Sequence, residues 1–405
     1  MCKGECYNGV IEKKGCVLML VNVEFFDEDP IENVITSLNY KVDKTIFFGY
    51  SEISDKRKQD VSRFLKKSCG VKEVEFYELD KRKLIEIMET MSSCLKKETE
   101  RGNRLFFDLT GGESLLLVAF GALSRDYRAP MHMYDVESNK MQEYHMKDVV
   151  PLSQAAEYSP IKLNLDAFIS LYGGKINYMM HKDVKNLSSQ ELAEDIEKMW
   201  SVSRTYHRKW LHYSAMLRSF KEQTAYLTVQ ADRACFDREK KKNPAVGTSD
   251  YFVRFLKECE AKGLLCNLDC SNGRFYFNYK NETIKNYFWD GGSILEMYTY
   301  TKLQKQYPSE DCRVGVHIDW DGVIHSGGGQ DVVNEIDAMV MNHNLPVFVS
   351  CKIGNVNQMA LYELETVADQ FAGKYAKKIL AVAKPLSPGY QTRAEEMGIE
   401  VWLMQ

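Results

Sequence analysis

Short apolar runs alternate with helical patterns through residues 17–145. Five runs have the length, the β-branched and aromatic content and the polar flanks of strands. Strands that alternate with helices in this way are joined by right-handed crossovers, so the pattern predicts an α/β fold with a parallel, doubly wound, Rossmann-like sheet. The predicted strands are 17–23, 44–50, 71–79, 104–110 and 130–137, and the predicted helices are Ile31–Leu38, Lys56–Cys69, Lys81–Lys97 and Ser114–Arg125.

This sheet is expected to bind a ligand at one edge. Ligands bind doubly wound sheets beyond the C-terminal ends of the strands, where the strand order reverses. A Rossmann strand order would place the loops after the first and fourth strands, Asn22–Pro30 and Thr110–Ser114, side by side.

Two glycines, Gly111 and Gly112, stand directly before the helix predicted to start at Ser114. They let the backbone approach a ligand closely, and the free N–H groups of a helix start favour an anion. Thr110 and Ser114 can add hydroxyl hydrogen bonds. The alternative is a tight turn that needs glycines only for its backbone angles. No GxGxxG or GxxxxGK[ST] motif occurs, which disfavours NAD binding and ATP hydrolysis.

The middle of the chain, residues 151–285, reads as helices followed by a strand–turn–strand around Ser271–Gly273. This order resembles a small winged-helix module or a packed linker domain, with either structural support or nucleic-acid binding as its role. Residues 201–245 hold ten Lys and Arg against four Asp and Glu, interleaved with Tyr206, Trp210 and Tyr213. Such a stretch is a solvated face or a groove that follows a nucleic-acid strand.

Residues 286–405 return to an α/β pattern, so three domains are expected, at 1–150, 151–285 and 286–405. The third contains an amphipathic helix at 291–304 and a glycine-rich loop at Ser326–Gln330. Its predicted strands are RVGVHIDW, EIDAMVM, LPVFVSCKIG and KKILAVAK, with a helix, QMALYELETVADQFAGKY, before the last of them.

A carboxylate and a lysine are expected to meet in this third domain. Glu335 and Asp337 point to the same face of one strand, because side chains two apart in a strand do so. A hairpin turning at Asn342–Leu345 would bring Asp337 beside Lys352 on the next strand. This pair suits metal-assisted phosphodiester hydrolysis, with Mg²⁺ or Mn²⁺ on the carboxylate and the lysine near the water or the phosphate. The alternative is an ordinary cross-strand ion pair.

Three further acids lie near this pair in the sequence. Glu296 is in the preceding amphipathic helix, and Glu363 and Glu365 are in the helix after Lys352. Glu365 borders that helix's apolar stripe, whereas Glu363 points away from it. A carboxylate at a buried edge needs a partner, so Glu365 is the better second metal ligand. The stripe consists of Leu361, Leu364, Ala368 and Phe371.

The histidines add little to this site. His317 and His325 flank Asp319 and Asp321, which are expected to be strand-end or turn residues rather than metal ligands.

Composition limits the function classes. The formal charge of −4, with 53 Lys and Arg against 57 Asp and Glu, argues against a globally basic nucleic-acid binder but not against a local basic groove. The N-terminus lacks the apolar run of a signal peptide, and no stretch reaches the roughly 18 apolar residues of a membrane span. The eleven cysteines read as reduced thiols of a cytoplasmic protein. Cys2, Cys6 and Cys16 lack a fourth partner for zinc.

The string NEIDAMV…VFVSCKIGN resembles the core of the PD-(D/E)xK nuclease superfamily. Ser350 stands where that signature has an acid, as in the restriction endonucleases that share SxK and carry the acid on the following helix. Glu365, thirteen residues after Lys352, occupies that place. The resemblance implies metal binding by Asp337, Glu365 and the carbonyl of Cys351, and a transition-state or water contact for Lys352. It implies an outer acid at Glu296.

A Rossmann-like domain with a strand–TGG–helix turn, joined to such a nuclease, resembles the CRISPR-associated Rossmann fold (CARF) nucleases of type III CRISPR systems. The resemblance implies a homodimer, activated by a cyclic oligoadenylate, most often the tetra-adenylate ring, that cleaves DNA, RNA or both with Mn²⁺ or Mg²⁺. Two copies of the ligand loops would hold one symmetric ring. The implied ligand-binding residues are Asn22, Thr110, Gly111, Gly112, Glu113 and Ser114, with adenines on Phe25 and Tyr50.

A second reading is a ligand-responsive transcriptional regulator, because CARF-like sensors are also joined to winged helices and residues 250–285 could form one. A third possibility, that the sensor domain degrades its own ligand, is left open by the sequence.

Overall fold

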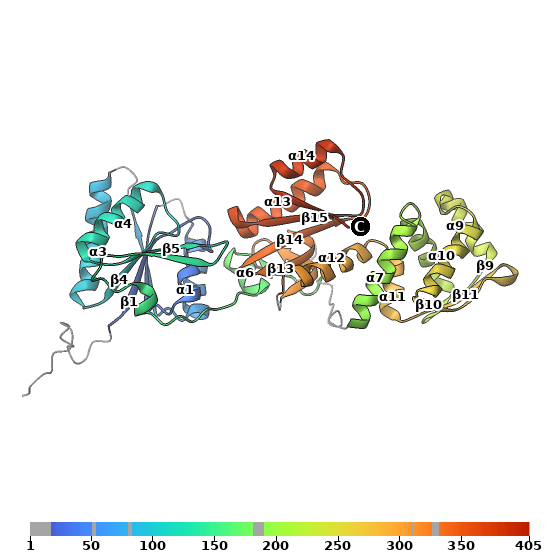
Figure 1. The fold of residues 1–405 in the computed structure, drawn as a ribbon, viewed down its shortest axis with the longest axis horizontal. Helices are drawn as coiled ribbons and strands as arrows, with labels where there is room; N and C mark the ends of the chain where they lie inside the picture. The colour runs from blue at the N-terminus through green and yellow to red at the C-terminus, as the bar shows by residue number, and fades with distance from the viewer. Residues whose placement is uncertain are drawn as a thin grey trace, which may run out of the picture. The chain divides into compact units, whose positions relative to one another are not determined.

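The computed structural model describes residues 18–50, 54–79, 83–180, 190–308, 311–325 and 332–404 (Figure 1). The chain divides into two compact units, which we describe separately. Unit 1 is residues 1–174 with 372–375, and unit 2 is residues 175–371 with 376–405. Cys2, Cys6, Cys16 and the glycine-rich loop Ser326–Gln330 lie outside the described residues.

Unit 1 is built on a six-stranded sheet of order β3-β2-β1-β4-β5-β6. The first five strands are parallel and β6, which the sequence pattern did not predict, is antiparallel. The expected Rossmann order is therefore confirmed, with β1 between β2 and β4. The strands are β1 (Leu20–Phe25), β2 (Lys44–Gly49), β3 (Glu73–Glu78), β4 (Arg104–Asp108), β5 (Met131–Asp135) and β6 (Lys140–Tyr144).

The helices of unit 1 cover both faces of this sheet. Side chains of α3 and α4 pack on the β1 face that carries Val21 and Val23, and α1 contributes Thr36 to the opposite face. The helices are α1 (Ile35–Asn39), α2 (Asp55–Phe64) with a π-helical continuation (Leu65–Cys69), α3 (Leu84–Glu100), α4 (Ser114–Tyr127), α5 (Leu152–Ala155) and α6 (Leu165–Leu171).

Two predicted boundaries in unit 1 were wrong. β1 continues to Phe25, so Asn22 lies inside the strand rather than in the loop. Asn22 and Glu24 alternate with apolar neighbours and are buried on the polar side of the sheet, which extends the strand pattern. The helix expected from residue 31 begins at Ile35, because the Asn33 side chain bonds the N–H and C=O of Asp27 and holds a loop there.

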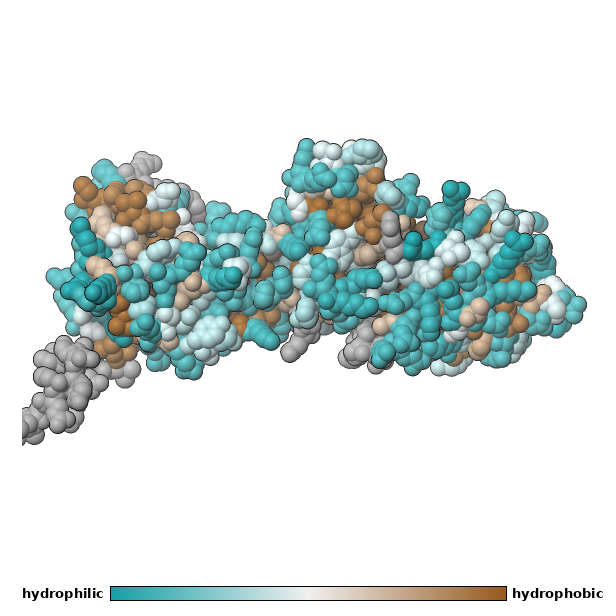
Figure 2. Space-filling model, viewed as in Figure 1, coloured by the Kyte–Doolittle hydropathy of each residue, from teal (hydrophilic) through white to brown (hydrophobic). Residues whose placement is uncertain are grey.

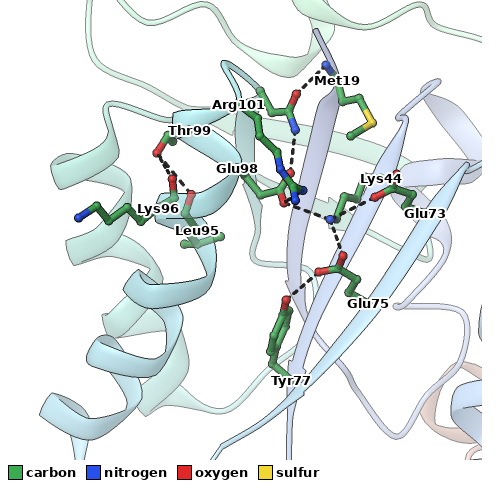
Figure 3. A network of polar contacts seen from close by, with 11 residues as sticks. Met19, Lys44, Glu73, Glu75, Tyr77, Leu95, Lys96, Glu98, Thr99 and Arg101 are labelled. Atoms are coloured by element: carbon green, nitrogen blue, oxygen red, sulfur yellow. Dashed lines mark hydrogen bonds and ion pairs between the residues drawn. The ribbon is translucent and has the colours of Figure 1, made fainter. Parts of the chain in front are cut away.

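The N-terminal ends of β2 and β3 surround a buried lysine (Figure 3). Lys44 Nζ lies 2.6 Å from Glu75, 3.1 Å from Glu98 and 3.3 Å from Glu73. Glu98 is also buried, and it accepts hydrogen bonds from Arg101 and Asn103. Burial would lower the pKa of Lys44, but its hydrogen bonds to Glu75 and Glu98 raise that pKa above its ordinary value. This network joins β2, β3 and α3 at the edge opposite the ligand loops.

Unit 2 contains a six-stranded mixed sheet of order β16-β15-β14-β13-β12-β7. β14, β15 and β16 are parallel, and β12, β13 and β14 are antiparallel. In Figure 1 the strands lie between α12 and α13. The elements are β7 (Lys175–Ile176), α12 (Ser293–Gln306), β12 (Cys312–Asp319), β13 (Val333–Asn342), β14 (Leu345–Lys352), α13 (Gln358–Ala372), β15 (Lys377–Val382), α14 (Pro388–Glu396) and β16 (Ile399–Leu403).

The middle of the chain forms a four-stranded antiparallel sheet of order β10-β11-β9-β8 with helices packed around it. The predicted helix–strand–turn–strand is present as α10, β10, the turn Ser271–Gly273 and β11. The elements are α7 (Gln190–Thr205), α8 (Trp210–Ser219), β8 (Thr224–Ala225), β9 (Thr228–Asp232), α9 (Arg233–Lys242), α10 (Ser249–Ala261), β10 (Leu265–Asp269), β11 (Arg274–Tyr279) and α11 (Glu282–Trp289).

One aromatic core joins this sheet, α12 and one face of the larger sheet. Trp210 and Tyr213 are buried in it, and the Tyr213 ring lies 4.8 Å from that of Phe255. They are core residues rather than an exposed stacking platform, because their three-residue spacing places both on the buried face of α8. Within the described ranges, no helix is long and apolar enough to cross a membrane.

We expect Lys44→Met to lower the free energy of unfolding of unit 1 by about 3–5 kcal/mol, because it leaves Glu98 buried without its main countercharge. Urea denaturation followed by circular dichroism measures this change. Lys41→Met is the matched control, since Lys41 pairs with Glu157 on the exposed surface, and it should change stability by less than about 1 kcal/mol. Equal effects of the two variants would contradict a structural role for the network.

Candidate functional site

Strands β13 and β14 separate near the middle of the sheet of unit 2. They pair from Asn342 and Leu345 as far as Ala338 and Val349. Beyond this point β13 stays paired with β12 to Val333, and β14 stays paired with β15 through Lys352. The main-chain N–H groups of β14 beyond Val349 that faced β13 therefore need other acceptors.

Asp337 lies at this fork and supplies such an acceptor. Its Oδ2 accepts a hydrogen bond from the N–H of Cys351 at 2.6 Å and from the Ser350 hydroxyl at 3.2 Å. Lys352 Nζ lies 3.8 Å from the same oxygen. The predicted contact between Asp337 and Lys352 is confirmed, and Ser350 and Cys351 join it. The carboxylate is held in one orientation by the main chain, with a cation beside it.

The side chain of Cys351 faces α12. Its thiol is buried against Thr299 and near Glu296. Burial, Asp337 and Glu296 raise the pKa of the Cys351 thiol well above its ordinary value. The main-chain carbonyl of Cys351 is an oxygen donor of the kind that Mg²⁺ prefers.

Glu365 has a protein partner in this structure. Its carboxylate lies 3.6 Å from Nζ of Lys378, a buried residue of β15 that also lies 3.5 Å from Asp369. The apolar stripe Leu361, Leu364, Ala368 and Phe371 is buried as predicted, and Glu363 is exposed.

The oxygen donors of the fork fit a hydrated divalent ion. Mg²⁺ keeps several waters and takes one or two carboxylates, so Asp337 and the carbonyl of Cys351 are suitable donors. Glu365 would have to leave Lys378 to join them. Within the described ranges, no group of three or more His, Cys, Asp or Glu residues is arranged to hold a metal ion.

The acids beside the histidines are turn residues, as predicted. Asp319 accepts hydrogen bonds from the N–H groups of Gly322 and Val323, and Asp321 accepts one from Val323. His317 Nε2 lies 3.7 Å from Glu335, and His325 is exposed.

In unit 1, hydrogen bonds to buried residues of the sheet hold the loop after β4 in place. The N–H and the hydroxyl of Thr110 both donate to Oδ1 of Asp108, and the Thr110 hydroxyl accepts from the N–H of Tyr134 at 3.0 Å. The hydroxyl of Thr110 is therefore engaged in holding the loop.

The two glycines form a tight turn against β1. Gly112 has a φ of +112°, and a Cβ there would lie 3.1 Å from Cβ of Phe25. A Cβ on Gly111 would lie 3.1 Å from the Asp27 side chain, whose Oδ2 accepts from the N–H of Gly112 at 3.2 Å. The conformation and the close approach both require glycine at 112.

The turn leads into the N-terminus of α4, which no described side chain caps. Such an end offers N–H groups to an anion, and Ser114, its first residue, is exposed. Glu113 accepts a hydrogen bond from the Tyr50 hydroxyl at 3.2 Å. The rings of Tyr50 and Phe25 are buried edge to face, 5.5 Å apart, so neither offers an open face to an adenine in this arrangement.

Directly beneath this turn lies a buried polar cluster that the sequence analysis missed. Glu24 and Asp108 are cross-strand neighbours at the ends of β1 and β4. Oδ2 of Asp108 accepts a hydrogen bond from Thr36 of α1 and lies 3.2 Å from Nε2 of His132 on β5. Asn22 is fully buried beside them, so it can support the ligand loops but does not reach the surface. Polar residues at every second position of β1 were the available signal.

The pKa values of the two acids of this cluster, Glu24 and Asp108, are shifted in opposite directions. Burial and the nearby Asp108 raise the pKa of Glu24 well above its usual value. Burial alone would raise the pKa of Asp108, but His132 and the hydroxyls of Thr110 and Thr36 lower it. A protonated Glu24 and an ionised Asp108 can therefore share the same buried space.

No protein-family model and no curated protein sequence matches the chain. Among the solved structures that match it, two do so over nearly the whole length of both chains. Protein VC1899 from Vibrio cholerae matches with a TM-score of 0.67 and 18% identity, covering 95% of this chain and 94% of that chain. Can2 from Sulfobacillus thermosulfidooxidans, in complex with cyclic tetra-adenylate, matches with a TM-score of 0.61 and 15% identity, covering 95% and 93%. The chain shares their fold.

The pKa of Glu24 predicts a pH-dependent stability. Because this pKa is raised on folding, the contribution of neutral Glu24 is present below the unfolded value of about 4.3 and is lost as pH rises through the folded value. Glu24→Gln stays neutral, so its stability relative to wild type should increase from pH 4 to pH 8. The increase is about 1.4 kcal/mol per unit of the raised pKa. Urea denaturation across this pH range measures it.

Glu137→Gln, at an exposed glutamate of the same unit, is the control and should show a flat difference. A flat difference for Glu24→Gln as well would contradict a raised pKa at Glu24.

Proposed function

We propose that this protein is a metal-dependent nuclease, activated by a cyclic oligoadenylate, that acts in type III CRISPR defence. The observation that carries the proposal is the Asp337 carboxylate, fixed by the N–H of Cys351 at the strand fork with Lys352 beside it. The shared fold with Can2, whose structure contains cyclic tetra-adenylate, supports the activator.

In this proposal Asp337 and the carbonyl of Cys351 would hold Mg²⁺ or Mn²⁺, with Glu365 as a further ligand if its carboxylate left Lys378. Such an ion lowers the pKa of a bound water and offsets the charge of the phosphate. Lys352 either orients the attacking water or stabilises the additional negative charge on the phosphate. Ser350 keeps the Asp337 carboxylate in place through its hydroxyl, and Glu296 is an outer acid.

The activator would bind at the α4 N-terminus of unit 1. Its phosphates would meet the uncapped N–H groups and the Ser114 hydroxyl. The buried cluster around Asp108 fixes the turn, so little loop ordering is needed on binding. Activation requires that the ring bind the nuclease-competent arrangement more tightly than the resting one.

A two-fold ring fits a homodimer, and unit 1 has an apolar face for a second copy. Figure 2 shows hydrophobic residues gathered over the part of unit 1 where α3 and α4 lie in Figure 1. Among them, Ile85 is 71% exposed and Val118 is 58% exposed. Val118 lies one turn along α4 from Ser114, so pairing through this face would place two ligand loops close to the two-fold axis.

A transcriptional regulator is the second candidate, because the order helix–strand–turn–strand of α10, β10 and β11 resembles that of a winged helix. A specific footprint on duplex DNA without cleavage would favour it.

We expect Asp337→Asn and Lys352→Ala each to lower cleavage by about 100-fold or more, because each removes a group that acts on the developing charge. The assay measures cleavage of labelled DNA and RNA with Mn²⁺ or Mg²⁺, with and without cyclic tetra-adenylate. Binding of the ring, followed by thermal shift, should be unchanged in both variants.

Glu365→Gln should lower cleavage to the same extent, and Glu363→Gln, on the exposed side of α13, should leave it unchanged. Full activity of Glu365→Gln would show that its pairing with Lys378 is structural only. Cleavage that does not depend on the ring would contradict the gating, and no cleavage of any substrate would contradict the nuclease.

We expect the double variant Ile85→Asp, Val118→Asp to be monomeric in sedimentation velocity, because it buries charge in the proposed dimer face. Its affinity for cyclic tetra-adenylate should fall by at least tenfold, since one copy contacts only half of the ring. Tyr251→Asp, which replaces an exposed aromatic residue of unit 2, is the control. A double variant that remains dimeric would contradict this choice of interface.

A further inference from the structure

A cavity of about 200 Å³ lies in unit 2 directly beyond the proposed catalytic strand. One wall comes from the end of α7 and the start of α8, and the other from the residues that follow β14 and β15. Lys352 and Val382 are neighbours in the parallel pair β14–β15, and the N–H of Ala383 donates to the carbonyl of Lys352. Ile353 and Lys384, which line the cavity, therefore leave the sheet beside Lys352.

The floor of the cavity is aromatic and rigid. Trp200 is 3% exposed and stacks on Tyr298 of α12 at 5.2 Å, and Trp210 is 2% exposed with its indole N–H bonded to the carbonyl of Gly291. The indole N–H of Trp200 is buried and has no hydrogen-bond partner among the described residues. An unpaired buried donor costs about 1–3 kcal/mol.

The rim of the cavity is positively charged. Arg204, Arg208 and Lys384 line it, and no Asp or Glu of the described ranges does. Among the described residues, none of these three side chains forms a hydrogen bond or an ion pair. Three unpaired cations around an apolar floor are complementary to a molecule that combines a flat ring with phosphate groups.

We propose that this cavity is a nucleotide subsite for the substrate strand, a proposal that rests on the proposed nuclease function. One unstacked base occupies the cavity, and Arg204, Arg208 and Lys384 bind the flanking phosphates. The volume is below the roughly 300 Å³ of the smallest drug-sized pockets, so it suits a single base. A base inside a duplex is stacked on both sides, so it can enter only when it is unpaired or flipped out.

This subsite assigns phosphate binding to only some of the basic residues in the stretch 201–245. Arg204 and Arg208 belong to that stretch and line the cavity, whereas Lys221, Arg238 and Lys241 belong to it and are exposed elsewhere. With Lys384 added to Arg204 and Arg208, the two sets of three form matched variants with the same change of charge.

The test is binding of a fluorescein-labelled single-stranded oligonucleotide to the full-length Asp337→Asn protein, by anisotropy, with cyclic tetra-adenylate at several salt concentrations. Adding Arg204→Ala, Arg208→Ala and Lys384→Ala should weaken binding at least tenfold. It should also reduce the salt slope by about 2, at roughly 0.7 per phosphate contact on a single strand. Adding Lys221→Ala, Arg238→Ala and Lys241→Ala should change affinity less than twofold. Equal effects of the two triples would overturn the subsite.

A second variant tests the base without changing charge. Ile353→Trp fills the cavity and should weaken binding of the oligonucleotide, whereas an oligonucleotide with one abasic position should bind wild type and variant more equally. Unchanged binding by Ile353→Trp, with a native circular dichroism spectrum, would overturn the base-binding floor. Tight binding of free adenosine monophosphate that does not compete with the oligonucleotide would overturn it in favour of a small-molecule site.

These outcomes separate the subsite from the nuclease. Cavity-dependent binding in a protein that cleaves nothing would support the subsite and contradict the nuclease. Cleavage that the triple variant leaves unchanged in KM and kcat would support the nuclease and contradict the subsite.

Discussion

The main-chain N–H group that is left without a partner where strand pairing stops is the constraint on which both candidate sites depend. Such a group must find an acceptor when it is buried. In unit 2 the N–H of Cys351 finds Asp337, and in unit 1 the N–H groups of Thr110 and Gly112 find Asp108 and Asp27. A carboxylate held by the main chain in this way has a fixed orientation.

In each unit this constraint fixes the position of a carboxylate. The backbone orients the Asp337 carboxylate before any ligand binds. Binding a cation therefore costs this side chain less conformational entropy than it would cost a freely rotating carboxylate. Asp108 does not reach the ligand surface, but through Thr110 it fixes the turn that aims the α4 N-terminus outwards. The same interaction therefore orients the proposed metal ligand in one unit and supports the turn in the other.

The sequence predicted those features that depend on strand periodicity. Strand order in unit 1 and the meeting of Asp337 with Lys352 follow from alternation and hairpin length, and both are confirmed. It did not predict the partner of Glu365, because Lys378 arrives from a parallel strand whose register no local pattern encodes. The cluster around Asp108 was missed for the same reason, since its members come from three strands and a helix. The charged neighbours of Trp210 indicated a solvated face or a groove, whereas its helical spacing from Tyr213 agrees with the buried position that the structure shows.

Helix α12 connects the fork with the aromatic floor of the neighbouring cavity. Tyr298 stacks on Trp200 at that floor, and the next residue, Thr299, contacts the thiol of Cys351, whose N–H holds Asp337. Because closely packed cores shift as units rather than deform continuously, a displacement of α12 moves the floor and the fork together. A base in the cavity and a cation on Asp337 would then both act on the position of α12, so the two binding events would be linked.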